Sequence, residues 1–423
     1  MRRTLPIHIL WDSSHIWGLM AYRAIKAKDL PCRLTKAQEI PFFLKNKKQA
    51  PKILLVPGGN ARLKAKALGL AGLTAIRDFV RYGGIYLGFC GGAGLALKHS
   101  AEDLGLNLCP WERKPYHDRL QHLVSGHLLV KIESSNLTPA KFHGRIIPLP
   151  VWWPGRFLPD ANKTVQILAE VEAHAADFWL GDLPLKTIPR EFFQIWQDEY
   201  GVNLSADFLQ KTPLIITGTF GQGRYILSYS HLETPKSPAA NKLLAHILEE
   251  LTGLKIQTPT PTWDLSIPPK YLPTDPNLKP LGLALHIVQD LFKLGQEQHL
   301  FFPRTPWLFG WKSGLPGAQL NSLHSALVTL LNSPISQAAY NYWQGVNQEF
   351  LSHLKLFRAS AAENLLTHRV AQALDQGLPP MISQQDLKER SRAIFGSPLD
   401  GGGILAKLLD VIEEMIFLSQ VGE

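Results

Sequence analysis

The chain has 423 residues, of which 45% are hydrophobic and 19% charged, and its formal net charge is +9. This composition excludes a disordered chain, and the length predicts two domains because a single hydrophobic core rarely grows beyond about 250–300 residues. Lys and Arg are scattered, and the one dense cluster, KNKK at 45–48, has no interleaved aromatic residues, so we predict a solvated loop and no nucleic-acid partner.

The cysteines are few and widely spaced. Cys32, Cys90 and Cys109 form no Cys-x-x-Cys pair, which argues against a disulfide framework and a zinc site, and we predict neither a metal nor a cofactor. No apolar run reaches the ~18 residues of a membrane span, and the apolar run near residue 7 is too short for a signal peptide. We therefore predict a cytoplasmic protein with no membrane partner.

Short apolar runs alternate with helical spacing along the first hundred residues. The predicted elements, in chain order, are strand 7–12, helix 15–27, strand 32–40, strand 52–59, helix 70–84, strand 85–90 and helix 92–100. Gly83 and Gly84 fit a helix C-terminus. Strands that alternate with helices predict a parallel sheet with helices on both faces.

The middle of the chain changes to an antiparallel pattern, and the end is helical. The runs TPLIITGTF and RYILSYSH flank a GQG loop and predict a hairpin, after which residues 241–253 predict an amphipathic helix. We predict three parts: a domain at 1–255, a Pro-rich linker at 256–279, and an all-α domain at 280–423. The last part contains five amphipathic segments: 281–296, 319–332, 335–357, 361–374 and 404–420.

Cys90 lies in the stretch GFCGG, directly after a predicted strand and before a predicted helix. A nucleophile elbow holds its reactive residue in strained backbone between a strand and a helix, so its neighbours two positions away must be small. Gly88 and Gly92 meet that requirement, and the helix dipole favours a thiolate at this place. The alternative is a glycine-rich turn that contains a small buried cysteine.

A nucleophilic cysteine needs a base and a group that orients the base. Among the 15 histidines only His231 has an acid two positions later, Glu233, although about one such match is expected by chance. His231 ends a predicted strand, where alternation directs both side chains the same way. The amide of Gly91 is one candidate oxyanion donor, and Gly58 or Gly59 is the second, because parallel strands bring their carboxyl ends to one edge.

Other residues are candidates for the pocket wall. Asp12 follows the first strand at the same edge, and it could equally cap the following helix. Trp152, Trp153 and Arg156 are candidates for recognising an acyl or carboxylate group, and the alternative for them is a packed aromatic loop.

These motifs, in this order, resemble the class I glutamine amidotransferase-like fold. The closer of two resemblances is to the amino-terminal domain of biotin-protein ligases and its stand-alone bacterial relatives. It covers roughly residues 5–253 and depends on the segments VPGG, GGIYLGFCGGAG and GQGRYILSYSHLE. The resemblance implies an α/β, flavodoxin-like three-layer sandwich, with Cys90 as nucleophile, His231 as base and Glu233 as its orienting group. Where the family has aromatic-Asn-Gly-Gly, this chain has Trp152-Trp153-Pro154-Gly155-Arg156. The chain has no Gly-Arg-Gly-Arg-like motif, so biotin ligase activity is not expected.

Two functions remain open from the sequence. The first is a cysteine-dependent hydrolase or amidotransferase-like protein that acts on a small-molecule or peptide amide, or another acyl substrate. The second is a binding or regulatory module that keeps the fold without turnover and binds a protein partner through its helical domain. Selective reactivity of Cys90 would distinguish the first from the second.

Overall fold

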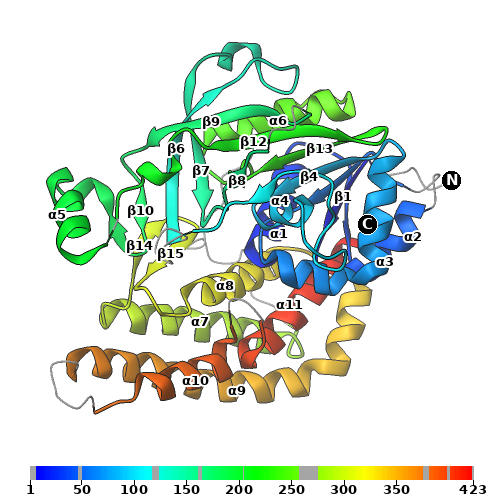
Figure 1. The fold of residues 1–423 in the computed structure, drawn as a ribbon. Coiled ribbons are helices and arrows are strands. Elements are labelled where there is room, and N and C mark those ends of the chain that lie inside the picture. Colours follow the sequence, from blue (N-terminus) through cyan, green and yellow to red (C-terminus); the bar gives the residue numbers. More distant parts are fainter. Residues whose placement is uncertain are drawn as a thin grey trace. The chain divides into compact units, whose positions relative to one another are not determined.

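The structure is a computed structural model, and it describes residues 6–45, 50–116, 123–160, 164–202, 204–256, 275–374, 381–397 and 401–421 (Figure 1). The chain divides into two compact units, Met1–Thr262 and Trp263–Glu423. Residues 46–48 of the basic cluster and residues 257–274 of the predicted linker lie outside the described residues.

The amino-terminal unit is built on a mixed sheet that, within the described residues, contains eleven strands. Five neighbouring strands are parallel, in the order β2-β1-β3-β4-β13, which is the flavodoxin-like arrangement. Their bounds are Ile7–Leu10 for β1, Cys32–Thr35 for β2, Ile53–Val56 for β3, Ile85–Phe89 for β4 and Gly223–Ser228 for β13. β3 (ILLV) and β4 (IYLGF) read as continuous apolar runs because both of their faces are covered, whereas Arg33 of β2 and Arg224 of β13 are only partly buried.

The sheet continues beyond β13 with antiparallel strands. The predicted hairpin is present, because β12 (Pro213–Phe220) pairs with β13 across a two-residue loop. The remaining strands are β6 (Val124–Ile132), β7 (Ile146–Trp152), β9 (Gln166–His174), β10 (Trp179–Leu180) and β11 (Leu183–Pro184). A separate short ladder joins β5 (Glu112–Arg113) to β8 (Phe157–Leu158). In the order β9-β12-β13-β4, β13 pairs antiparallel with β12 and parallel with β4, so the antiparallel and parallel parts of the sheet join at β13.

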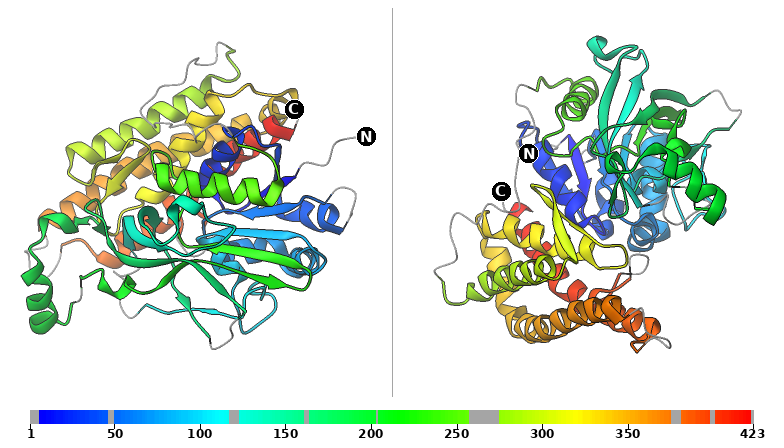
Figure 2. Two further views of the ribbon diagram at one scale, coloured as in Figure 1. Left: turned by 90° about the horizontal axis from the view of Figure 1, so that it is seen from above. Right: turned by 90° about the vertical axis from the view of Figure 1, so that its left-hand side faces the viewer.

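Helices cover both faces of this sheet, and α3 and α6 lie on opposite sides of it (Figure 2). The helices of the unit are α1 (His15–Lys26), α2 (Ile40–Lys45), α3 (Ala61–Arg81), α4 (Gly91–Ala96), α5 (Arg190–Tyr200) and α6 (Pro238–Thr252). The range of α3 contains two helices joined at Gly69, whose φ of 57° and ψ of −179° are not helical, so the predicted helix from 70 is the second of them. The first helix was not predicted, and it begins where the Asn60 side chain accepts hydrogen bonds from the amides of Arg62 and Leu63. The predicted three-layer α/β architecture is confirmed.

The carboxy-terminal unit is helical, as predicted. Its helices are α7 (Lys279–Glu297), α8 (Gly317–Leu331), α9 (Gln337–Leu374), α10 (Gln384–Phe395) and α11 (Gly403–Val421). Two predicted segments join into the 38-residue α9, because no Gly or Pro interrupts the chain between them. A short hairpin, β14 (Phe301–Thr305) and β15 (Leu308–Trp311), accompanies the helices and was not predicted.

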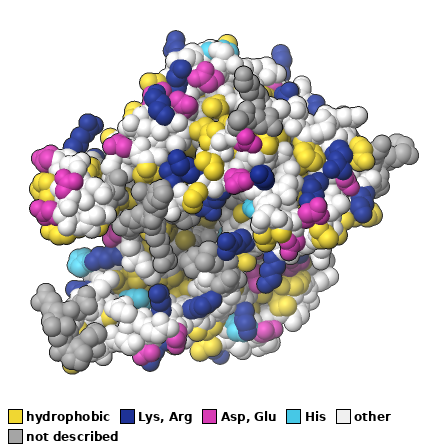
Figure 3. Space-filling view, in the orientation of Figure 1, with side chains coloured by type: hydrophobic (Ala, Val, Ile, Leu, Met, Phe, Trp, Pro, Cys, Tyr) yellow, Lys and Arg dark blue, Asp and Glu magenta, His cyan; other side chains and the backbone are white. Residues whose placement is uncertain are grey.

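Two surface properties follow from the described residues. None of their helices is both long enough and apolar enough to span a membrane. On the face shown in Figure 3, Lys and Arg side chains are dispersed among other side chains and form no single basic patch.

Candidate active site

Cys90 occupies a strained turn between β4 and α4. Its φ of 47° and ψ of −105° are rare for a residue with a side chain, and its amide donates to the carbonyl of Ser228 at 2.7 Å. The strand ends at Phe89 and the helix begins at Gly91. This strand-turn-helix backbone agrees with the predicted elbow, and the Cys90 side chain is partly exposed.

The glycines around Cys90 allow two turns to interlock. A Cβ at Gly91 would overlap the carbonyl oxygen of Gly59, and one at Gly92 would overlap that of Val56. A Cβ at Gly88 would lie 2.7 Å from the Gly92 carbonyl oxygen, which is too close for a real contact. The turn after β3 therefore lies directly against the turn that holds Cys90.

We expect Gly91→Ala to destabilise the amino-terminal unit by about 1–3 kcal/mol, the usual cost of inserting atoms into packed space. Gly94→Ala is the matched control in the same helix, because its Cβ would stand 3.8 Å from Ala61 and 3.9 Å from the Tyr229 hydroxyl, ordinary contact distances. Urea unfolding of both variants measures the difference, and equal midpoints would contradict the interlocked turns.

The predicted oxyanion donors lie beside one another. Gly91 is the first residue of α4, where the amide has no acceptor within the helix. Gly59 has a φ of 112° and follows Gly58 after β3. The Gly59 carbonyl oxygen faces the Gly91 Cα, as the overlap above requires.

His231 and Glu233 form a buried pair. The imidazole Nδ1 lies 2.7 Å from Glu233 Oε1, and both side chains are fully buried. The sequence predicted that strand alternation brings these two side chains together. That reason is wrong, because β13 ends at Ser228 and both residues lie beyond it. A turn brings them together, in which the Thr234 amide donates to the His231 carbonyl at 3.0 Å and the His231 amide donates to the Pro150 carbonyl at 3.0 Å.

The second imidazole nitrogen, Nε2, is buried and meets no partner of good hydrogen-bond geometry among the described residues. Burial by itself lowers the pKa of His231, but the Glu233 carboxylate and the Cys90 side chain outweigh it and raise the pKa to about 10. The Cys90 side chain therefore lies near enough to the imidazole to affect its charge.

Aromatic residues surround this histidine, and one of them was not predicted from the sequence. The Trp17 ring, from α1, lies 4.3 Å from the His231 ring between centroids. A Cβ at Gly58 would stand 2.6 Å from His231 Cε1, so the glycine turn also touches the imidazole. Trp17 sits within an ordinary amphipathic helix, and no spacing in the sequence distinguishes it from a core residue.

The two predicted tryptophans lie next to the cysteine and the histidine. The Trp152 carbonyl oxygen is 3.9 Å from Cys90 Sγ, and the indole donates to the Thr234 hydroxyl at 3.3 Å. Trp153 has a φ of 52°, and its ring centroid lies 6.0 Å from that of Trp17. Both tryptophans therefore belong to the surroundings of the buried pair.

Arg156 and Asp12 are held by the backbone. The Arg156 guanidinium donates to the carbonyls of Pro115 at 2.7 Å and Phe208 at 3.3 Å, and it stacks on the Tyr116 ring. The Asp12 carboxylate accepts the Ala37 amide at 2.6 Å and so caps the short 3-10 helix Ala37–Glu39. The structural alternative for Asp12 named the helix that follows it, whereas the helix that its carboxylate caps begins 25 residues further along the chain. Arg156 packs on an aromatic ring, as its alternative states.

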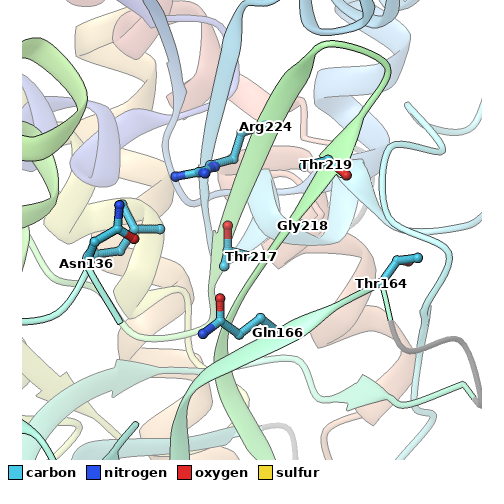
Figure 4. Close-up of a pocket in the computed structure, with 8 residues that line it drawn as sticks. Asn136, Thr164, Gln166, Thr217, Gly218, Thr219 and Arg224 are labelled. Carbon is cyan, nitrogen blue, oxygen red and sulfur yellow. The ribbon is translucent and has the colours of Figure 1, made fainter. Parts of the chain in front are cut away.

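The polar cavity in Figure 4 lies away from Cys90. Thr217, Gln166 and Arg224 are among its lining residues, from β12, β9 and β13. Arg224 pairs with Ile85 at the start of β4, whereas Cys90 follows the far end of that strand, so the cavity lies toward the opposite end of the sheet. The described residues contain no cluster of three or more His, Cys, Asp or Glu side chains suited to a metal.

Residues 45–104 match the family model described as "Biotin-protein ligase, N terminal". The segment contains the Gly58-Gly59 turn and Cys90, and it ends before His231. This match confirms the predicted resemblance for those residues. No curated protein matches the sequence.

Several solved structures resemble part of the chain at low identity. PurLQS from Thermotoga maritima is 12% identical, with a TM-score of 0.39, and the match covers 58% of this chain and 98% of that one. A protein from Thermoplasma acidophilum described as part of a GMP synthase is 11% identical, with a TM-score of 0.35, over 60% and 96%. A ThuA-like protein from Bacteroides uniformis is 11% identical, with a TM-score of 0.36, over 62% and 96%.

Proposed function

We propose that the amino-terminal unit is a cysteine-dependent hydrolase of amidotransferase-like type that acts on an amide or other acyl substrate. Cys90 is the nucleophile, His231 the acid and base, and Glu233 the group that orients the imidazole. The observation that carries this proposal is the fully buried pair of His231 Nδ1 and Glu233 Oε1, 2.7 Å apart, beside a cysteine on a strained turn.

The resting state in this proposal is an ion pair. Because the pKa of His231 is raised to about 10, the imidazole is protonated at neutral pH. A cation beside the sulfur favours the thiolate, which is the reactive form of cysteine. The Glu233 carboxylate holds the proton on Nδ1, so Nε2 carries the proton that faces the reaction.

The reaction then follows from the position of each proton. The Cys90 sulfur forms a bond to the acyl carbon, and the carbonyl electrons move to oxygen, which the amides of Gly91 and of Gly58 or Gly59 stabilise. The His231 Nε2 proton passes to the leaving nitrogen as the carbon–nitrogen bond breaks. Water next gives a proton to Nε2 and attacks the thioester, the sulfur–carbon bond breaks, and a carboxylic acid is released.

The walls of the site define the substrate only by class. Trp152 and Trp153, with Trp17, supply an aromatic surface suited to the apolar part of an acyl group or amide. Arg156 and Asp12 have no contact with the substrate in this proposal, because both side chains are hydrogen-bonded to backbone groups. We place the protein in a reducing compartment such as the cytoplasm, where the thiol stays reduced.

The test is turnover of a panel of primary amides, including glutamine, with ammonia release as the signal. The wild-type protein is expected to release ammonia from at least one amide, and Cys90→Ala to lose at least about a hundredfold in rate. Cys32→Ala is the matched control and should retain the activity. A panel of thioesters and activated esters extends the test to other acyl groups.

Failure has a defined meaning. If no substrate is turned over and Cys90 reacts no faster than the other cysteines, the hydrolase proposal is wrong. That outcome would favour the binding module, in which the helical unit Trp263–Glu423 docks a protein partner.

A further inference from the structure

The turn that carries Glu233 is clamped from helix α6. The Asn241 side-chain nitrogen donates to the carbonyl of Leu232 at 3.0 Å and to that of Thr234 at 2.9 Å. These carbonyls belong to the residues immediately before and after Glu233. Asn241 is only 7% exposed, so both bonds are made away from bulk water.

A second set of contacts holds the start of the same helix, at its N-cap residue Ser237. His127 Nε2 lies 2.8 Å from the Ser237 hydroxyl, and His127 Nδ1 lies 2.7 Å from Asp177 Oδ2. The Asn241 amide donates to the Ser237 carbonyl at 2.9 Å. Ser237 and Asn241 therefore connect the chain after Glu233 to β6 and to the segment that contains Asp177.

Ser237, His127 and Asp177 have the order of a serine-hydrolase triad, but the surroundings do not suit a nucleophile. The Ser237 residue is 2% exposed, so an acyl carbon has no approach to its oxygen. The next residue, Pro238, has no N–H, whereas the amide after the nucleophile is a usual oxyanion donor. The network is suited to holding the start of α6.

We propose that Asn241 is a positioning residue for the catalytic pair: its two hydrogen bonds fix the backbone on both sides of Glu233 and so direct the carboxylate at His231. This inference rests on the proposed function. An amide nitrogen has two donors, and both are used here on neighbouring carbonyls two residues apart, which sets the turn in one conformation. Without Asn241, two buried carbonyls lose their donor and the turn is free to rotate Glu233 away.

The experiment compares the rate at which iodoacetamide alkylates Cys90, from pH 6 to 10, in the wild type and in variants. Asn241→Ala is expected to slow the reaction at pH 7 by about tenfold and to move the rise of the rate to higher pH, because the histidine loses its oriented carboxylate. Asn241→Ser keeps one donor and should recover part of the alkylation rate. If the alanine variant does not fold, the serine variant tests whether Asn241 positions Glu233.

Asn321 is the matched control. It is fully buried in the carboxy-terminal unit, and its side-chain nitrogen donates to the carbonyls of Phe309 at 3.1 Å and Gly317 at 2.8 Å. Asn321→Ala should lower stability by a similar amount but leave the alkylation profile of Cys90 unchanged.

Two failures are distinguishable. A fast wild-type Cys90 whose profile is unchanged in the folded Asn241 variants overturns this inference alone. A wild-type Cys90 that reacts no faster than Cys32 overturns the proposed function, and this inference with it. A shift that Asn321→Ala reproduces would also overturn it, because lost stability would then explain the change.

Discussion

Iodoacetamide at neutral pH is expected to alkylate Cys90 at least about tenfold faster than Cys32 or Cys109. The imidazole of His231, whose pKa is raised to about 10, is the cation that the proposed mechanism places beside the Cys90 sulfur. Burial raises the pKa of Cys32 to about 12 and also raises the pKa of Cys109. Mass spectrometry of the labelled peptides gives the three rates from one sample.

His231→Ala should bring the alkylation rate of Cys90 down close to the rates of the other two cysteines, because the cation proposed to stabilise its thiolate is lost. His174→Ala is the matched control, since His174 is a partly buried histidine of the same unit that stacks on Phe178. Equal rates for the three cysteines, or equal effects of the two histidine variants, would contradict the triad. Cys32 has the same intermediate exposure as Cys90, so access alone does not explain a difference.

Glu233→Gln is expected to lower the free energy of unfolding by about 3–5 kcal/mol near pH 6.5, the usual cost of removing one partner from a buried ion pair. The pKa of His231 is about 10 in the folded protein and near 6.5 in the unfolded chain. Between these values the folded state binds more protons, so the stability from this pair is complete below pH 6.5 and disappears as pH rises to about 10. The difference between wild type and variant should therefore shrink over that interval.

Urea unfolding at several pH values between 6.5 and 10 measures this difference. Glu39→Gln is the control, because Glu39 pairs with Arg33 at 3.1 Å with both side chains about a quarter exposed. Arginine keeps its charge throughout the interval, so this control should show a small loss that does not change with pH. Parallel curves for the wild type and Glu233→Gln would contradict a protonated His231.

The match to the biotin-protein ligase amino-terminal family covers the part of the site that is local in sequence. Residues 45–104 include the glycine turn after β3 and the cysteine turn after β4, which contact one another in the fold. The histidine and glutamate come from a turn more than a hundred residues later. The experiments above test that distant half of the site directly.

Local pattern predicted the elements that surround the cysteine. The runs at β1, β3 and β4 are buried on both faces, and they are recognisable because nearly every position is apolar, with His8 of β1 as an exception. The glycines beside Cys90 were also predictable, because a close turn excludes a Cβ whatever the rest of the fold does.

Other features depended on contacts that no local pattern contains. The sequence placed His231 and Glu233 on a strand, yet β13 ends at Ser228 and a turn fixed by Pro150 and Asn241 brings the pair together. Trp17 reaches His231 from the first helix.

By itself, then, the sequence determined the α/β fold and the turn bounded by glycines at Cys90, and it named His231 and Glu233 as candidates. The tertiary structure decided the orientation of the imidazole, the high pKa of His231 and the backbone roles of Arg156 and Asp12. The physical reason is the distance along the chain between the groups that interact. Steric limits and apolar burial act on neighbouring residues, whereas the protonation of a buried histidine depends on groups that only folding brings within a few ångströms.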